Sequence, residues 1–273
     1  MGATIIVGGQ SGNEGKTKVL DFWNVKENFD VVIQTNGSVS SSNIPMQVFP
    51  RLVSIWVESI DKFLEEMKES PVETFKIDQF TLITSQEGWS KRAKDIPELE
   101  PYVDDVQNLL CELTVQGASI VIEGQYGYMD SYQYLKDFQK THMDTTASSV
   151  VSRCGIGIFD VDEIIMVYQL TDEFDLSLAR QGISVTDPNV VIINGFDQSE
   201  SDTLELDDSQ LERLQSIEND LNISIDYVGT GPNTLLSVDE IKAENGFVRD
   251  ETPQEFEDDM DVFVEEFKAQ MAD

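Results

Sequence analysis

Short apolar runs rich in β-prone residues recur along the chain, and segments of helical character lie between several of them. The runs lie at residues 4–7, 31–34, 80–84, 118–122, 163–168, 190–193 and 223–228. The clearest helical segments are 55–68 and 103–113. Continuous apolar strands that alternate with helices are typical of a mainly parallel sheet with helices on both faces. The pattern therefore predicts the α/β class with one central sheet flanked by helices.

Turn-forming residues follow five of these runs and locate the candidate ligand loops. They are Gly8, Asn36, Gly124, Asn194 and Gly229. In a parallel sheet the loops that follow the strands gather at the carboxyl edge, where ligands bind. We therefore expect these five loops to line one crevice.

The hydrophobic pattern changes near the C-terminus. Residues 1–249 are predicted to form a single α/β nucleotide-binding domain, since a chain of 273 residues can bury one sizeable core. Residues 250–273 carry large apolar side chains at helical spacing among acids, which predicts an acidic amphipathic helix. That helix packs on its own domain or docks on a partner. The acidic, serine-rich segment 197–209 is predicted to be an exposed loop.

The charge balance limits the partners of the chain. Fifty-two acids against eighteen bases give a net charge of −34, which excludes nucleic acid and anionic membranes as partners. The acids are spread along the whole chain, which favours a halophilic cytoplasm over a local acidic binding face. Neither a membrane span nor a signal peptide is expected. Cys111 and Cys154 lack metal-ligand spacing, which fits a reducing, cytoplasmic compartment.

The first apolar run leads into a loop with unusual glycine content. Its glycines are Gly8, Gly9, Gly12 and Gly15. Lys16 and Lys18 follow, and the next residues are compatible with a helix. A strand, glycine loop, lysine and helix together direct backbone N–H groups at phosphate. The strict P-loop pattern is not met, because Gln10 stands where its first glycine would be, and a structural turn is the alternative.

Segment 9–21, GQSGNEGKTKVLD, resembles the opening loop of adenylosuccinate synthetases, which reads G-Q-x-G-D-E-G-K-G-K-x-x-D. These are GTP-dependent ligases of purine synthesis. Segments 123–134, 140–157 and 161–168 resemble the archaeal branch of that family, and 174–180, 193–197 and 228–232 resemble its guanine-side segments. The resemblance implies a shortened form of the family's P-loop-NTPase-like fold, and a homodimeric assembly.

The resemblance also implies GTP as co-substrate or ligand, Mg²⁺ as a cofactor and a purine nucleotide as the bound partner. The implied nucleotide-binding residues are Gly12, Glu14, Gly15, Lys16, Lys18, Thr141, Thr145, Asp197, Gly231 and Pro232. Thr141 would contact a nucleotide phosphate. Asp197 would accept hydrogen bonds from two guanine nitrogens, which selects guanine over adenine. Gly231 and Pro232 would belong to the loop that closes over the base.

The catalytic positions depart from the family. In the family, GTP phosphorylates the carbonyl oxygen of IMP and aspartate then displaces the phosphate. Asn13 replaces the aspartate that acts as base and magnesium ligand, and an amide accepts no proton although its oxygen can coordinate Mg²⁺ weakly. Ser42 replaces the histidine that stabilises the moving phosphoryl group, and serine has no cationic form. Tyr126 replaces a glutamine that contacts the purine.

A deletion separates the chain further from the family. Between Tyr168 and Phe174 the family carries a long insert with the arginine-rich loop that binds aspartate, and no arginine follows here before Arg180. We therefore predict a purine-nucleotide-binding relative with impaired ligase activity, a pseudoenzyme that acts as a sensor or subunit. One alternative is an active, reduced ligase that joins aspartate to IMP or (d)GMP, since a branch that acts on deoxyguanylate tolerates a small polar residue at the base position. A protein-binding scaffold is the other.

Overall fold

The computed structural model describes residues 2–10, 14–35, 39, 42–131, 144–171, 174–196 and 205–244. One compact unit spans Met1–Ile241, and a second begins at Lys242. The predicted helix 250–273 and the predicted boundary at 249 lie outside the described residues, so both stay predictions. Within the described ranges, no helix combines the length and the apolar character that crossing a bilayer requires.

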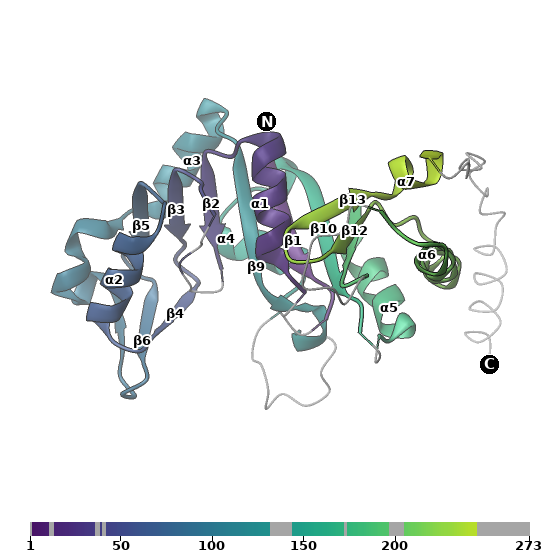
Figure 1. Cartoon of the computed structure of the whole chain (residues 1–273). Helices are drawn as coiled ribbons and strands as arrows, with labels where there is room; N and C mark the ends of the chain where they lie inside the picture. Colours follow the sequence, from purple (N-terminus) through teal and green to yellow (C-terminus); the bar gives the residue numbers. More distant parts are fainter. Residues whose placement is uncertain are drawn as a thin grey trace, which may run out of the picture. The chain divides into compact units, whose positions relative to one another are not determined.

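A ten-stranded sheet runs through the compact unit, in the order β13-β12-β11-β10-β1-β9-β2-β3-β5-β8. Its strands are β1 (Ala3–Gly8), β2 (Val31–Gln34), β3 (Met46–Phe49), β5 (Thr74–Asp78), β8 (Val103–Asp104), β9 (Ile120–Gly127), β10 (Val161–Gln169), β11 (Val190–Asn194), β12 (Tyr227–Thr230) and β13 (Thr234–Ser237). Every neighbouring pair is parallel except β12 and β13. This confirms the predicted α/β class, and β1 lies at the centre of the sheet between β10 and β9 (Figure 1).

Helices cover both faces of this sheet because successive strand residues point to opposite sides. Ile6 packs with the buried face of α1 (Lys16–Glu27) in one core cluster. Ile5 and Val7 belong to a second cluster, on the other face. That cluster contains residues of α3 (Val106–Gln116), α4 (Ala147–Cys154), α5 (Leu176–Thr186) and α6 (Asp208–Leu221). The sheet is thus the middle layer of three.

A smaller sheet accompanies the main one, in the order β4-β6-β7. Its strands are β4 (Ser54–Val57), β6 (Leu82–Ser85) and β7 (Ser90–Arg92), and α2 (Ile60–Glu69) shares their core cluster. The prediction for 55–68 was wrong at its start, because Ser59 caps α2 by accepting from the Lys62 amide, and residues before that cap are free to form a strand. The predicted run 80–84 corresponds to β6, which lies in this sheet and not in the central one.

Gly8 and Asn194 are the last residues of their strands, β1 and β11, but two other predicted turn residues lie inside strands. Gly124 lies inside β9, where a Cβ would come 2.9 Å from the Ile6 carbonyl oxygen, so this glycine permits close strand approach and makes no turn. Gly229 lies inside β12, which begins only at Tyr227. The predicted loop 197–209 ends earlier than expected, because Asp207 and Gln210 form a capping box that starts α6.

The two thiols differ in environment and give a first testable prediction. Cys111 is exposed on α3, while burial of Cys154 at the end of α4 raises the pKa of its thiol to about 12. Since the thiolate is the reactive form, we expect one equivalent of thiol to react with a disulfide reagent in the folded protein and two after unfolding. C111S should leave no rapidly reacting thiol. Two fast equivalents in the native protein would contradict the buried position of Cys154.

Candidate functional site

The glycine loop leaves the carboxyl end of β1 and enters α1, as predicted. Gly15 directly precedes α1 with φ of 81°, a left-handed conformation that favours glycine. As the cap residue it offers no side-chain acceptor, so the first amides of α1 face the loop without a side-chain cap. Gly12 and Asn13 lie outside the described residues, so their predicted roles stay predictions.

The lysine of the loop is held inside it by a carboxylate. Lys16 Nζ lies 3.0 Å from Glu14 Oε2 and donates to the Tyr126 carbonyl oxygen at 2.9 Å. Glu14 Oε1 accepts from the Gln10 amide at 2.8 Å. Glu14 is 0% exposed and Lys16 is 7% exposed, so the ion pair is buried. A phosphate that reaches this ammonium must share it with Glu14 or displace the carboxylate.

Two glycines make room for that carboxylate. A Cβ on Gly8 would lie 2.5 Å from Glu14 Oε2, and one on Gly127 would lie 2.4 Å from Glu14 Oε1. Gly127 also faces the Gln10 carbonyl oxygen, at 2.1 Å from such a Cβ. The glycines around the loop are therefore needed for packing within the loop, in addition to any room that they leave for a ligand.

Tyr126, which the resemblance places where the family has a glutamine, has a strained backbone. Its φ is 56°, where a bulky residue is an outlier that costs on the order of 1–3 kcal/mol. The strain accompanies a shift in the β1–β9 register, from Ile6 opposite Glu123 to Gly8 opposite Gly127. In this conformation the Tyr126 carbonyl oxygen accepts a hydrogen bond from Lys16, and Tyr126 is 43% exposed. Such outliers concentrate at functional sites.

The predicted base-side segments meet the glycine loop. Asn194, the last residue of β11, donates its side-chain amide to the Glu14 carbonyl oxygen at 2.6 Å. Lys18 Nζ donates to the Gly231 carbonyl oxygen at 2.9 Å, in the turn between β12 and β13. Pro232 is exposed in that turn. The structure thus brings Glu14, Lys18 and Gly231 together, while Asp197 lies outside the described residues.

Asn194 is a site residue that the sequence analysis located only as a loop. It is buried, and its Oδ1 has no hydrogen-bond partner within the described part of the chain. A Cβ on Gly229 would lie 1.9 Å from this oxygen and 3.0 Å from Lys18 Nζ, so both groups face the open side of Gly229. A polar residue directly after a buried apolar strand was the available signal.

Glu123 on β9 was also missed. Its carboxylate accepts from Gln34 Nε2 at 2.8 Å and from Thr17 Oγ1 at 3.4 Å. Burial raises the pKa of Glu123, and these hydrogen bonds and the Lys16 charge oppose that shift. A single acid within an apolar strand was the signal for it.

Two other predicted residues are buried. Ser42, which the resemblance places where the family has a histidine, is 1% exposed. Thr145 donates its hydroxyl to the Gly127 carbonyl oxygen at 2.7 Å, so it fixes the end of β9. Thr141 lies outside the described residues, and its predicted phosphate contact stays a prediction.

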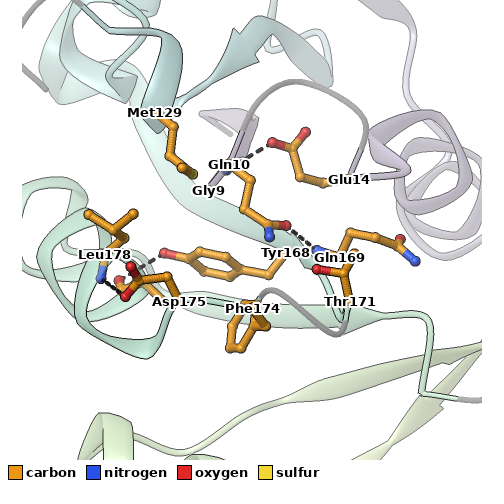
Figure 2. A pocket seen from close by; sticks show the side chains of 11 residues that line it. Gly9, Gln10, Glu14, Met129, Tyr168, Gln169, Thr171, Phe174, Asp175 and Leu178 are labelled. Carbon is orange, nitrogen blue, oxygen red and sulfur yellow. Dashed lines mark hydrogen bonds between the residues drawn. The ribbon is translucent and has the colours of Figure 1, made fainter. Parts of the chain in front are cut away.

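A cavity of about 270 Å³ adjoins the loop on the α5 side of the sheet. Figure 2 shows the Tyr168 ring between Gln10 on one side and Asp175 and Leu178 on the other. Asp175 caps α5, and Leu178 lies in its first turn. Gln10 accepts from the Gln169 amide at 2.6 Å and so joins the loop to the end of β10. The lining residues are Gly9, Gln10, Glu14, Met129, Tyr168, Gln169, Thr171, Phe174, Asp175, Leu178 and Ala179. None of these described lining residues carries a positive charge.

The connection between β10 and α5 is short. β10 ends at Gln169 and α5 begins at Leu176, with Asp175 as its cap. The position that the sequence analysis identified as a deletion relative to the family thus falls in this short connection.

The curated proteins that are similar to this chain in sequence share one name. No protein-family model matches the chain. An adenylosuccinate synthetase of Thermococcus onnurineus is 41% identical over 80 residues, which are 29% of this chain and 24% of that protein. One of Methanococcus aeolicus is 26% identical over 227 residues, 62% of this chain and 66% of that protein. The chain spans about a quarter of the length of the first curated relatives it matches.

Solved structures show the same fold at low identity. The cyanophage S-2L succinoaminodeoxyadenylate synthetase, solved with dGMP and dATP, superposes with a TM-score of 0.71 at 14% identity. That match covers 90% of this chain and 98% of the other. The Plasmodium falciparum adenylosuccinate synthetase gives a TM-score of 0.70 at 12% identity, over 87% of this chain and 100% of the other.

Proposed function

We propose that this chain, an adenylosuccinate synthetase-like protein, binds a purine nucleotide at the edge of its central sheet and lacks ordinary ligase activity. The nucleotide would place its phosphates at the loop between β1 and α1. Its base would lie toward the ends of β11 and β12. We further propose a homodimer in a halophilic cytoplasm as the setting for this function.

One observation carries the proposal. The hydrogen bond from Asn194 to the Glu14 carbonyl oxygen joins the end of β11 to the glycine loop, and the bond from Lys18 to Gly231 joins α1 to the β12–β13 turn. Three segments far apart in sequence therefore meet at the carboxyl edge of the sheet, where nucleotides bind in open α/β folds. The N-terminus of α1, whose cap residue Gly15 has no side chain, and two lysines supply the positive potential that phosphate requires.

The charged groups that a ligase needs are missing from three places, which supports the loss of ligase activity. Asn13 accepts no proton, and the buried Ser42 has no cationic form to offer a phosphoryl group. A dicarboxylate in the cavity beside the loop would meet Glu14 and Asp175 and no cation among the described lining residues. Burying such an anion without a cationic partner is strongly unfavourable.

Calorimetric titration in high-potassium buffer tests binding. We expect GTP, GDP, IMP or dGMP to release or absorb heat with a stoichiometry of one per chain. A bound nucleotide at 100 times its Kd should also stabilise the fold by about 2.7 kcal/mol, seen as a raised Tm. Absence of heat and of stabilisation with all four would leave the protein-binding scaffold as the function.

Incubation with GTP, Mg²⁺, IMP or dGMP, and aspartate tests the loss of activity. We expect no succinylated product at ordinary turnover, which for enzymes is about 1–1,000 per second. Product at such rates would instead establish the active, reduced ligase.

A further inference from the structure

We propose that Thr17 and Glu123 together hold a divalent cation beside the phosphates of the bound nucleotide. The inference rests on the proposed nucleotide binding and assigns its cation to residues that differ from the family pattern. The family motif has glycine at position 17 and aspartate at position 13, whereas this chain has Thr17 and Asn13. Relative to that motif, this chain loses a carboxylate at position 13 and gains a hydroxyl at position 17.

The Thr17 hydroxyl and the Glu123 carboxylate lie close to each other. Thr17 lies in the first turn of α1, and its hydroxyl lies 3.4 Å from Glu123 Oε1 on the neighbouring strand β9. Two ligands at right angles around Mg²⁺, each about 2.1 Å from the ion, are about 3 Å apart. The pair needs only a small approach to share one cation. Phosphate-loop proteins in general use a hydroxyl of this loop and a carboxylate from an adjacent strand in this way.

A buried amide that contacts the proposed carboxylate ligand carries an oxygen without a partner among the described residues. Gln34 is 0% exposed, and its amide nitrogen donates to Glu123 Oε2 at 2.8 Å. Its Oε1 has no hydrogen-bond partner among the residues that the structure describes. A buried carbonyl oxygen without a partner is unfavourable, and amide oxygens are ligands that hard cations accept. The unpartnered oxygen therefore belongs to the same amide whose nitrogen contacts the proposed carboxylate ligand.

The surrounding charges predict when the cation binds. The N-terminus of α1 and the nearby Lys16 repel a lone cation, whereas Asp21, one turn along α1, adds negative charge near Glu123. No group of three or more acidic, histidine or cysteine ligands exists within the described ranges. Mg²⁺ often binds through one or two protein oxygens together with substrate phosphates. We therefore expect the cation to bind with the nucleotide and not before it.

The test compares GTP affinity in excess Mg²⁺ with GTP affinity in excess EDTA. For the wild-type protein we expect Mg²⁺ to tighten binding at least tenfold. T17V, which removes only the hydroxyl, and E123Q should each reduce that ratio below about threefold. T17S keeps the hydroxyl and should keep the ratio, as should T114V, whose hydroxyl bonds within α3. Mn²⁺ monitored by electron paramagnetic resonance should bind the wild-type protein stoichiometrically only when GTP is present.

The outcomes separate this inference from the proposed function. GTP binding with the same Mg²⁺ ratio in T17V as in the wild type would overturn the cation site and leave nucleotide binding intact. Absence of GTP binding with and without Mg²⁺ would overturn both. The decisive variant is T17V, because Thr17 is exposed and its replacement should not prevent folding, whereas E123Q changes a buried group.

Discussion

Replacing Lys16 with methionine is expected to abolish nucleotide binding and to lower the free energy of unfolding by about 3 kcal/mol. The methionine keeps most of the length of the side chain but removes the ammonium that contacts Glu14 and the Tyr126 carbonyl oxygen. Glu14, which is fully buried, would then be an anion without its cationic partner. Urea unfolding measures the loss of stability, and calorimetry with GTP measures the loss of binding.

The double variant E14Q/K16M is the matched control for that prediction. Removing both charges of a buried ion pair leaves no uncompensated buried charge, which is the main cost of removing one partner alone. The double variant should therefore regain most of the stability lost in K16M, yet it should still fail to bind GTP. A K16M protein as stable as the wild type would show that the Glu14–Lys16 pair is not buried as described.

Replacing Gly127 with alanine is expected to cost about 1–3 kcal/mol and to weaken nucleotide binding strongly. Its Cβ would lie 2.1 Å from the Gln10 carbonyl oxygen and 2.4 Å from Glu14 Oε1, so the glycine loop must move away from β9. That movement separates Lys16 from the Tyr126 carbonyl oxygen. Thermal unfolding and GTP titration measure the two effects.

Gly157→Ala serves as the control for this substitution. A Cβ at Gly157 would meet mainly the Asp160 carboxylate, at 2.6 Å, and that exposed side chain can move aside. We expect its Tm and GTP affinity to stay close to those of the wild type. If G127A and G157A behave alike, the close approach of β9 to the loop is not required.

The sequence predicted best those elements that are determined by residues close together in the chain. The run 4–7, the turn at Gly15 and the helix after it are local features, and β1 and α1 confirm them. β4 was missed because its residues 55–57 lie just before the Ser59 cap of α2, and the sequence pattern joined them to the predicted helix. The small sheet was missed because only pairing with β6 identifies β4 as a strand.

The site was harder to predict, because its contacts join residues far apart in the chain. The resemblance to a family supplied the order of the motifs and named Lys16, Lys18 and Gly231. It did not show that Asn194 bonds to the loop at Glu14, or that Glu123 faces Thr17. Such contacts follow from strand order, which local periodicity does not contain. The likeness to solved structures at 12–14% identity shows that very different sequences form this fold.

Phosphorus NMR of GTP mixed with the protein, Mg²⁺, IMP and aspartate follows nucleotide binding and turnover in one spectrum. We expect the GTP phosphate resonances to shift and broaden at stoichiometric protein, and no inorganic phosphate or GDP to accumulate over hours. Resonances that stay at their free positions would contradict nucleotide binding at the glycine loop. A steadily growing phosphate signal that depends on both IMP and aspartate would contradict the loss of ligase activity.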